Sequence, residues 1–354
     1  MTASKIKILV VDDSALIRRI LTDMLNSADD LTVVGTAADP YIAREKIKKL
    51  EPDVLTLDVE MPKMDGITFL SNLMRLHPMP VLMVSSLTDK NAQVTLQALE
   101  LGAVDFVTKP KSDVAQKLQD YVDELVTKVR AAARARIKGR AYKPDGQPAA
   151  AQADRGAGKK LGLDTTDKVF AIGASTGGTE AVREVLERMP VDCPGIMIVQ
   201  HIPTGFSKAF ADRMNQQTPL VVKEAEDGDL VIPGHVFIAP GDRHLTLVRD
   251  GARYVCRVTD GERVNSHKPS VELLFDSVLA SAGRNAAAAL LTGMGKDGAN
   301  ALLRLREAGI ATIAQDEATS VVWGMPGEAV KIGGADQVLP LESIADALGN
   351  VFRR

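Results

Sequence analysis

Short apolar runs alternate with amphipathic stretches along most of the chain. The runs are rich in Val, Ile, Leu and Ala, and many of them end at a polar or glycine residue. The stretches that follow carry apolar residues at helical spacing. This alternation is typical of folds in which buried parallel strands are linked by helices. We therefore expect an α/β protein.

The first part of the chain has the pattern of a parallel five-stranded sheet. A helix is expected from the capping residue Ser14 to about Ser27, a second over Tyr41–Leu50, and a further apolar helical face over 114–129. Together these elements predict one domain over residues 1–125. The predicted strands are Ile6–Val11, Thr32–Ala37, Val54–Leu57, Val81–Val84 and Asp105–Thr108.

A segment of low complexity separates this domain from the rest of the chain. Residues 139–162 are rich in Ala, Gly, Pro and charge and have almost no large apolar side chains. Such a composition buries too little surface to offset the entropy of ordering, so we predict a helix end and a flexible linker over residues 126–165. The basic run from Arg130 to Arg140 is either a solvated helix end or a contact for an acidic partner.

The alternation restarts at Val169 and predicts a second, doubly wound α/β domain over residues 166–354. Within it, Leu245–Arg249 and Tyr254–Val258 read as an antiparallel insertion, joined by a hairpin turn at Asp250-Gly251 and preceded by His235–Ala239 as a third insertion strand. Strands are predicted at 169–172, 195–200, 220–224, 287–291 and 311–314, and helices near 179–189, 205–217, 270–282, 298–308 and 341–352.

Composition narrows the class of protein. The chain of 354 residues exceeds the usual size of one hydrophobic core, and its net charge of −3 argues against a general nucleic-acid-binding surface. No apolar run approaches the ~20 residues that span a bilayer, and the N-terminus lacks the features of a signal peptide. Cys193 and Cys256 form neither a disulfide framework nor a metal-ligand spacing, so we expect two core cysteines in a cytoplasmic protein.

Acidic residues and a lysine follow the ends of separate predicted strands in the first domain. Asp12 and Asp13 follow the first strand, Asp58 the third, and Lys109 the fifth. In open α/β sheets this edge forms the ligand crevice. Crowded carboxylates need a cation, and Mg²⁺ prefers such oxygen ligands, so Asp12 or Asp13 together with Asp58 is a candidate metal site.

The same set suits phosphoryl transfer. Asp58 would attack the phosphorus, and Lys109 would pair with the resulting phosphate. Ser85, at the end of the fourth strand, would donate a hydrogen bond to that phosphate, and the charge change would reposition Phe106. Ser86 is the alternative for the switch hydroxyl, and we choose Ser85 because it follows the strand directly.

The second domain opens with the pattern Gly173-Ala-Ser175-Thr-Gly177. It fits G-x-S-x-G, a tight strand-to-helix turn that exposes a nucleophilic serine. The alternative is a serine that only caps the following helix. A dinucleotide site is disfavoured because the segment lacks G-x-G-x-x-G spacing.

A nucleophilic serine needs a base and an acid. Of five histidines, His201 lies at the same kind of strand end as Ser175, which favours it as the base. Asp297 follows Leu291-Thr-Gly-Met-Gly-Lys296 and is the candidate orienting acid. Backbone N–H groups near Met294 are candidates for an oxyanion hole. The order Ser, His, Asp is compatible with a triad because geometry rather than order defines one.

The first domain resembles a response-regulator receiver domain. The resemblance rests on Val11-Asp-Asp-Ser14, Leu57-Asp58, Met61-Pro-Lys-Met-Asp-Gly66, Ser85 and Phe106-Val-Thr-Lys-Pro110. It implies a flavodoxin-like fold, phosphorylation of Asp58 by a histidine kinase, and Mg²⁺ held by the acidic pocket.

The second domain resembles the catalytic domain of the protein-glutamate methylesterases of bacterial chemotaxis. This resemblance implies a catalytic triad of Ser175, His201 and Asp297, with Met294 at the oxyanion site. For His267 it leaves two roles open: the residue shapes the substrate cleft, or it only packs against its neighbours. The matching stretches are Ile172–Gly178, Val199–His201, Phe237–Gly241, His267–Val271, Leu291–Gly298 and Gln315-Asp-Glu317.

The resemblance implies a serine esterase that needs no cofactor for the ester step. Its substrates would be γ-glutamyl methyl esters on chemoreceptor helices, and some family members also deamidate receptor glutamines. We expect a monomer, without nucleic-acid partner or membrane insertion, whose receiver domain blocks the catalytic cleft until Asp58 is phosphorylated. The alternatives are a non-catalytic partner-binding output domain and an esterase or amidase for small molecules.

Overall fold

The computed structural model describes residues 4–86, 88–109, 115–135, 137 and 167–353. The chain divides into two compact units, Met1–Pro144 and Asp145–Arg354. The last helix of the first unit continues to Arg134. Most of the predicted linker, residues 138–165, lies outside the described residues. Within the described part of the chain, no helix is both long and apolar enough to cross a membrane.

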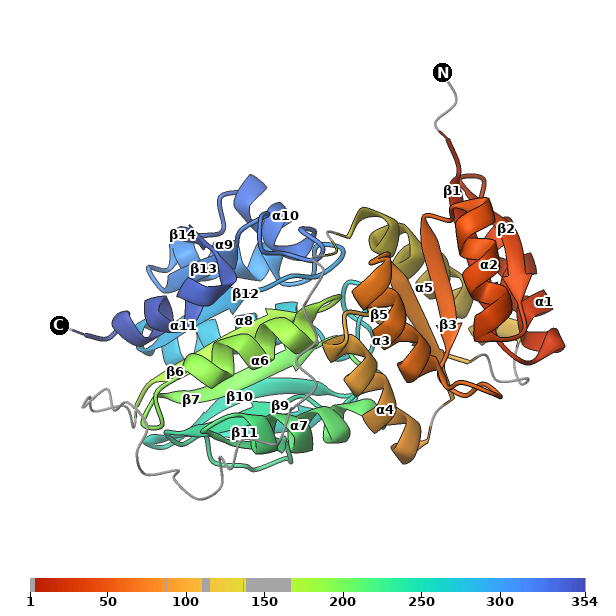
Figure 1. The fold of residues 1–354 in the computed structure, drawn as a ribbon. Helices are drawn as coiled ribbons and strands as arrows, with labels where there is room; N and C mark the ends of the chain where they lie inside the picture. The colour runs from red at the N-terminus through yellow and green to blue at the C-terminus, as the bar shows by residue number, and fades with distance from the viewer. Residues whose placement is uncertain (1–3, 87, 110–114, 136, 138–166, 354) are drawn as a thin grey trace. The chain divides into compact units, whose positions relative to one another are not determined.

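The first unit is a five-stranded parallel sheet with the strand order β2-β1-β3-β4-β5 (Figure 1). This order is that of flavodoxin-like folds and confirms the predicted fold class. The strands are β1 (Ile6–Val11), β2 (Leu31–Ala37), β3 (Val54–Asp58), β4 (Val81–Ser85) and β5 (Asp105–Thr108). The helices are α1 (Ala15–Asn26), α2 (Pro40–Leu50), α3 (Gly66–Leu76), α4 (Asp89–Glu100) and α5 (Ala115–Arg134).

Local sequence signals start the helices of this unit close to the ends of the strands. Ser14, Asp39, Asp65 and Thr88 cap α1 to α4, each accepting a hydrogen bond from a backbone N–H of the first helical turn. The strands β3 and β4 are buried along their whole length. Their polar last residues, Asp58 and Ser85, are therefore presented at the carboxyl edge of a fully covered sheet.

The second unit contains a seven-stranded sheet of order β14-β13-β12-β6-β7-β9-β8, in which every pairing is parallel. Its strands are β6 (Val169–Ala174), β7 (Gly195–Gln200), β8 (Val221–Glu224), β9 (His235–Ile238), β12 (Ala286–Leu290), β13 (Ala311–Gln315) and β14 (Gln337–Leu339). A separate two-stranded sheet consists of β10 (His244–Asp250) and β11 (Arg253–Thr259). The helices are α6 (Gly178–Arg188), α7 (Phe206–Gln217), α8 (Val271–Ala282), the short 3₁₀ helix η1 (Gly283–Asn285), α9 (Ala299–Glu307), α10 (Met325–Lys331) and α11 (Leu341–Asn350).

One strand prediction in this unit is wrong. His235–Ala239 was expected in the antiparallel insertion, but β9 pairs in parallel with both β7 and β8 inside the main sheet. Three of its four residues are buried, because it is an interior strand rather than part of a surface hairpin. The parallel β8–β9 connection is made by a loop without a helix, which removes the usual sequence signal of a crossover.

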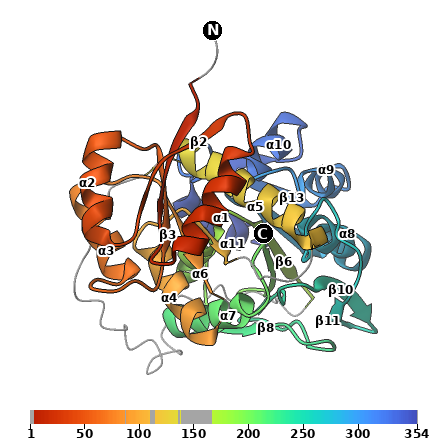
Figure 2. The ribbon, with the colours of Figure 1, turned by 90° about the vertical axis from the view of Figure 1, so that its right-hand side faces the viewer.

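The antiparallel hairpin itself is confirmed as β10–β11. Asp250 pairs with Arg253, so the two central turn residues are Gly251 and Ala252, one position later than predicted. The hairpin packs on α8 (Figures 1 and 2), and Ser277 and Ser281 of that helix hydrogen-bond to the backbone of Leu247 at 2.8 Å each. The insertion is thereby anchored to the helix that follows it.

The strand order reverses at β6. From this central strand the chain moves outward through β7 on one side and later returns to β12 on the other. In doubly wound sheets, ligand sites form outside the carboxyl ends of the strands at such a reversal. The loops after β6, β7 and β12 therefore meet where this topology predicts a ligand site, and they carry Ser175, His201 and Asp297 respectively.

Candidate active site and phosphoacceptor site

Ser175 lies in a tight turn between β6 and α6. Its N–H donates to the carbonyl of Thr292 at 3.0 Å, and its own carbonyl accepts from the N–H of Gly178 at 2.7 Å. Gly177 has a φ of 76°, in the left-handed region that favours glycine, and a Cβ there would lie 2.6 Å from the side chain of Val321. The predicted strand-to-helix turn is therefore present, and its serine is partly exposed.

The histidine lies at the neighbouring strand end. The N–H of His201 donates to the carbonyl of Ala174, the residue before Ser175, at 3.0 Å. The buried amide of Gln200 donates to the carbonyl of Ser175 at 2.9 Å and to that of His201 at 3.1 Å. These bonds fix the backbone of the two residues to each other, as the adjacent strand ends predicted.

Asp297 and His201 are in direct contact. Nε2 of His201 lies 2.9 Å from Oδ2 of Asp297, so the imidazole donates its Nε2 proton to the carboxylate. Nδ1 of His201 is buried and has no hydrogen-bond partner among the described residues. A buried nitrogen in that state costs free energy, and such groups occur where they have a role, for example as the acceptor of a proton from a nucleophile.

The pKa of Asp297 is low despite burial. Burial alone would raise it, but the hydrogen bond and the charge of His201, together with hydrogen bonds from Asn265 and the Val271 N–H, outweigh this effect and lower the pKa to about 2. The carboxylate is therefore ionised throughout the physiological range and can stabilise a protonated imidazole. Asp297 ends a loop rather than opening a helix, because α9 begins at Ala299 after the capping residue Gly298.

The glycine-rich loop after β12 lies against the serine. A Cβ on Gly293 would be 2.8 Å from Cβ of Ser175 and 3.0 Å from its backbone nitrogen, so only glycine fits. The N–H of Gly293 donates to Val322 at 3.0 Å, and its carbonyl accepts from Met325 at 2.8 Å. These bonds fix the backbone of Gly293 next to Ser175. The residue that follows is Met294, whose N–H is the predicted oxyanion donor.

Two contacts at this site come from the turn over residues 264–267. The sequence interpretation named one residue of this turn, His267. The ring of His267 stacks on that of His201, with centroids 3.8 Å apart and an interplanar angle of 14°. Asn265 donates from Nδ2 to Oδ1 of Asp297 at 2.9 Å. The sequence interpretation gave His267 as a cleft or packing residue, and the stack places it against the ring of His201. Asn265 was missed, although it is only two residues from that histidine.

The four predicted residues of the first unit also come together. Nζ of Lys109 lies 2.8 Å from Oδ2 of Asp58 and 3.0 Å from Oδ2 of Asp12. Carboxylate oxygens of Asp12, Asp13 and Asp58 lie within 4.8 Å of one another. The loop before α3 closes tightly on this site, since a Cβ on Gly66 would be 2.1 Å from the carbonyl oxygen of Asp58.

The electrostatics of this cluster fit a divalent cation. Burial raises the pKa of Asp58 to about 6, the charge of Asp12 adds to the rise, and the hydrogen bond from Lys109 opposes it. Oδ2 of Asp12 is buried and accepts no well-aligned hydrogen bond among the described residues. An additional positive charge would relieve the repulsion between these carboxylates, and hard oxygen donors of this type suit Mg²⁺.

The three residues considered for the phosphorylation switch lie at the end of β4 and on β5. Ser85 ends β4 and is fully buried, and its hydroxyl accepts from Oγ1 of Thr95 at 2.9 Å. Ser86 is partly exposed and accepts from Nδ2 of Asn91. Phe106 is buried, with Nζ of Lys128 5.3 Å from its ring centroid. The Ser85 hydroxyl also donates to the carbonyl of Ser86 at 3.4 Å.

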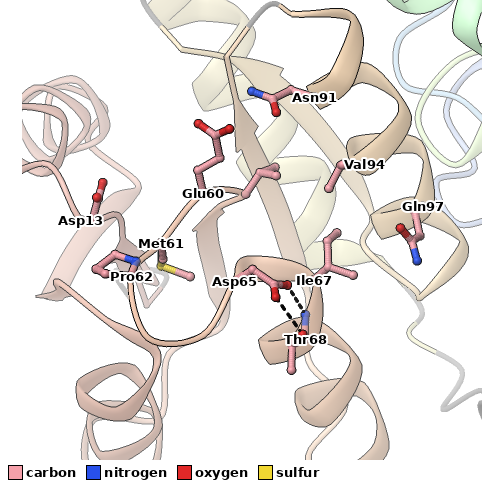
Figure 3. Close-up of a pocket in the computed structure, with 11 residues that line it drawn as sticks. Asp13, Glu60, Met61, Pro62, Asp65, Ile67, Thr68, Asn91, Val94 and Gln97 are labelled. Carbon is pink, nitrogen blue, oxygen red and sulfur yellow. Dashed lines mark hydrogen bonds between the residues drawn. The ribbon is translucent and has the colours of Figure 1, made fainter.

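An open hollow of about 730 Å³ borders the acidic cluster (Figure 3). It runs from Asp13 and Glu60 past the loop before α3 to the side chains of Val94 and Gln97 on α4. The exposed side chain of Asp13 is one of the residues that line it.

Comparison with known proteins identifies a family for each of the two domains. The model of the response regulator receiver domain matches residues 8–122, and that of CheB methylesterase matches residues 170–348. The chain belongs to the CheB methylesterase family. A relative from Xanthomonas euvesicatoria pv. vesicatoria, named protein-glutamate methylesterase/protein-glutamine glutaminase 1, is 54% identical and covers 97% of this chain and 96% of its own length.

A second relative and one solved structure extend this likeness. A protein of the same name from Hahella chejuensis is 56% identical, covering 96% of this chain and 94% of its own length. The crystal structure of the Thermotoga maritima CheB methylesterase catalytic domain is 38% identical with a TM-score of 0.51, covering 52% of this chain and 98% of that one. The family membership thus includes both domains, in the order in which the sequence predicted them.

Proposed function

We propose that this protein is a phosphorylation-controlled serine esterase that hydrolyses glutamyl methyl esters on chemoreceptors. The observation that carries the proposal is the contact between Nε2 of His201 and Oδ2 of Asp297, which leaves Nδ1 as the basic nitrogen at the strand end beside Ser175. The relatives described above are named for this activity. We place the protein in the cytoplasm, as a monomer without nucleic-acid or membrane-inserted partners.

The reaction follows from the assigned atoms. Oγ of Ser175 attacks the ester carbonyl while Nδ1 of His201 takes its proton, and Asp297 stabilises the imidazolium. The N–H of Met294 donates to the oxyanion of the tetrahedral intermediate. Collapse breaks the bond to the methoxy group, which leaves as methanol after His201 returns the proton.

A water molecule completes the cycle. It attacks the glutamyl-serine ester with His201 again as base, and the second collapse restores Ser175 and gives glutamate. A glutamine side chain would pass through the same acyl-enzyme with ammonia as the leaving group. We propose this deamidation as a second activity, because the relatives carry glutaminase in their names.

In the first unit we propose Asp58 as the phosphoacceptor, supplied by a histidine kinase. Asp12, Asp13 and Asp58 would hold Mg²⁺, which supplies charge neutralisation during phosphoryl transfer. Lys109, now paired with Asp58 and Asp12, would pair with the phosphate. Ser85 would donate to the phosphate, and Phe106 would change position with it. We propose that the unphosphorylated receiver restrains the esterase.

The experiment that tests this function compares two kinds of substrate. The full-length protein, Mg²⁺ and a small phosphodonor are mixed with receptors that carry labelled glutamyl methyl esters, and labelled methanol is measured. We expect methanol release. Hydrolysis of small esters without receptor demethylation would favour a small-molecule esterase, and no hydrolysis of either would favour a partner-binding output domain.

A further inference from the structure

The carboxylate of Asp297 is held by donors on both of its oxygens. Oδ2 accepts from His201, the base, and from one backbone N–H, while Oδ1 accepts from two side chains and a second backbone N–H. The donors, with distances to their oxygen, are His201 Nε2 (2.9 Å) and Val271 N–H (2.7 Å) on Oδ2, and Asn265 Nδ2 (2.9 Å), Ser270 Oγ (2.9 Å) and Glu272 N–H (3.3 Å) on Oδ1.

Most of these donors belong to the start of α8. Val271 and Glu272 are its first residues, and Ser270 is its capping residue, whose side chain makes no capping bond of its own. Asp297 therefore acts as the anion at the N-terminus of α8, where backbone N–H groups and the helix dipole favour a negative charge. These bonds hold both carboxylate oxygens from the helix, and Asn265 is the side-chain donor that adds a bond to Oδ1 from outside it.

Asn265 differs from the other donors because it comes from a surface turn. Val264 and His267 pair as an isolated bridge, and the two residues between them have φ values of 51° for Asn265 and 69° for Ser266. Asparagine and glycine tolerate this left-handed conformation better than other residues. The residue is exposed, yet its amide reaches the buried Oδ1 of Asp297.

The same turn also touches the base. Its last residue, His267, stacks on His201 at a centroid distance of 3.8 Å. One short turn thus contacts the acid through Asn265 and the base through His267. A change in this turn would alter the mutual orientation of His201 and Asp297 without touching Ser175.

We propose that Asn265 is a positioning residue for the acid–base pair of the esterase. Its carboxamide holds Oδ1 of Asp297, so that Oδ2 is directed at Nε2 of His201 and Nδ1 is directed at the serine. Asn265 does not contact the reacting atoms. The inference rests on the proposed esterase function. It adds that turnover also depends on Asn265, a residue outside the triad.

The test uses three substitutions in the full-length, phosphodonor-treated protein. Asn265→Gly keeps the left-handed turn and removes the donor. Asn265→Asp keeps the size and replaces the donor with a carboxylate that repels Asp297. Ser266→Gly is the matched control, because it lies in the same turn with positive φ and an exposed side chain.

The readouts are kcat and KM for methanol release from methylated receptor, together with the melting temperature. For Asn265→Gly we expect kcat to fall about 10-fold with KM within about twofold, since the lost interaction orients the catalytic groups rather than binding substrate. For Asn265→Asp we expect a fall of about 100-fold or more. Ser266→Gly should match the wild type, and all three should melt within a few degrees of it.

A Ser175→Ala variant separates this inference from the proposed function. If Ser175→Ala loses methanol release while both Asn265 variants keep the wild-type kcat, the positioning role is overturned and the esterase stands. An effect of Asn265→Gly confined to KM would also overturn it, because it would make Asn265 a substrate-binding residue. If the wild type releases no methanol, the proposed function itself fails.

Discussion

Nε2 of His201 lies 2.9 Å from Oδ2 of Asp297, and the opposite ring nitrogen, Nδ1, is buried without a hydrogen-bond partner among the described residues. In the chymotrypsin-type triad the two nitrogens have the reverse roles, with Nδ1 bound to the acid. Here the acid selects the tautomer that leaves Nδ1 unprotonated. In the proposed mechanism the base is therefore Nδ1, on a residue whose backbone N–H is bound to the carbonyl of Ala174, next to Ser175.

The first prediction concerns this tautomer. Asp297→Asn retains the size of the side chain, but its amide can donate to Nε2 and shift the ring proton to Nδ1. We expect kcat for receptor demethylation to fall on the order of 10³-fold or more with little change in KM. Steady-state methanol release measures this. A variant that keeps the wild-type kcat would remove Asp297 from the mechanism.

The second prediction concerns acid stability. The pKa of Asp297 is about 2 in the folded protein, below the ordinary value of 3.8, so folding favours its ionised form. Its contribution is present above about pH 4 and is lost as pH falls through about 2, and it amounts to about 2 kcal/mol. The difference in the free energy of unfolding between the wild type and Asp297→Asn, measured by urea denaturation, should shrink as pH falls from 5 to 2.

A control for that experiment is Asp346→Asn, which removes an exposed carboxylate on α11 from the same unit. It shows how much of the change comes from general loss of charge. A difference between wild type and Asp297→Asn that stays constant over this pH range would contradict the stabilisation assigned to the ionised carboxylate.

The third prediction concerns the loop beside the nucleophile. Gly293→Ala would place a Cβ 2.8 Å from Cβ of Ser175, so either the serine or the loop with the Met294 N–H must move. A misplacement of this kind costs about 100-fold in kcat. Gly251→Ala is the control for kcat: at the tip of the β10–β11 hairpin a Cβ meets nothing within 4 Å, and the left-handed φ of 56° confines its effect to stability. Equal kcat for both variants would refute a tight fit at Gly293.

The fourth prediction concerns the metal. Mg²⁺ binding to the folded receiver should raise its melting temperature in a concentration-dependent way, because a ligand that binds only the folded state stabilises it by mass action. Asp12→Asn should abolish this rise. Asp23→Asn, which removes an exposed carboxylate on α1, should leave it intact. A rise of the same size in Asp12→Asn would place Mg²⁺ elsewhere.

The fifth prediction concerns regulation. A small phosphodonor should raise the demethylation rate of the wild type and have no effect on Asp58→Asn, because that variant lacks the phosphoacceptor. Deletion of residues 1–140 should give a rate that is high and independent of the donor. Equal rates with and without the receiver would contradict restraint by this domain.

The polar residues at strand ends were the part of the site that sequence reasoning could locate. Parallel strands bring their carboxyl ends to one edge, so Asp12, Asp58 and Lys109 had to approach one another once the strands were recognised. The same rule placed Ser175 and His201 at neighbouring strand ends. The ion pairs of Lys109 and the hydrogen bonds between these two residues' backbones agree with it.

Contacts that depend on the conformation of a turn, or on pairing between distant segments, could not be predicted from the positions of strand ends. β9 was assigned to the insertion because a short apolar strand after a loop does not reveal its pairing partner. Asn265 was missed because its bond joins residues 32 positions apart through a two-residue left-handed turn. The nearby His267 was a signal that could have led to it, since this segment already matched the family.

Methanol release by wild type and Ser175→Ala from the same methylated receptors, with and without phosphodonor, tests the central claim most directly. We predict that the wild type releases methanol, faster with the donor, and that Ser175→Ala loses at least about 10³-fold in rate while keeping its melting temperature. A folded Ser175→Ala protein that releases methanol at the wild-type rate would contradict a serine esterase built on Ser175.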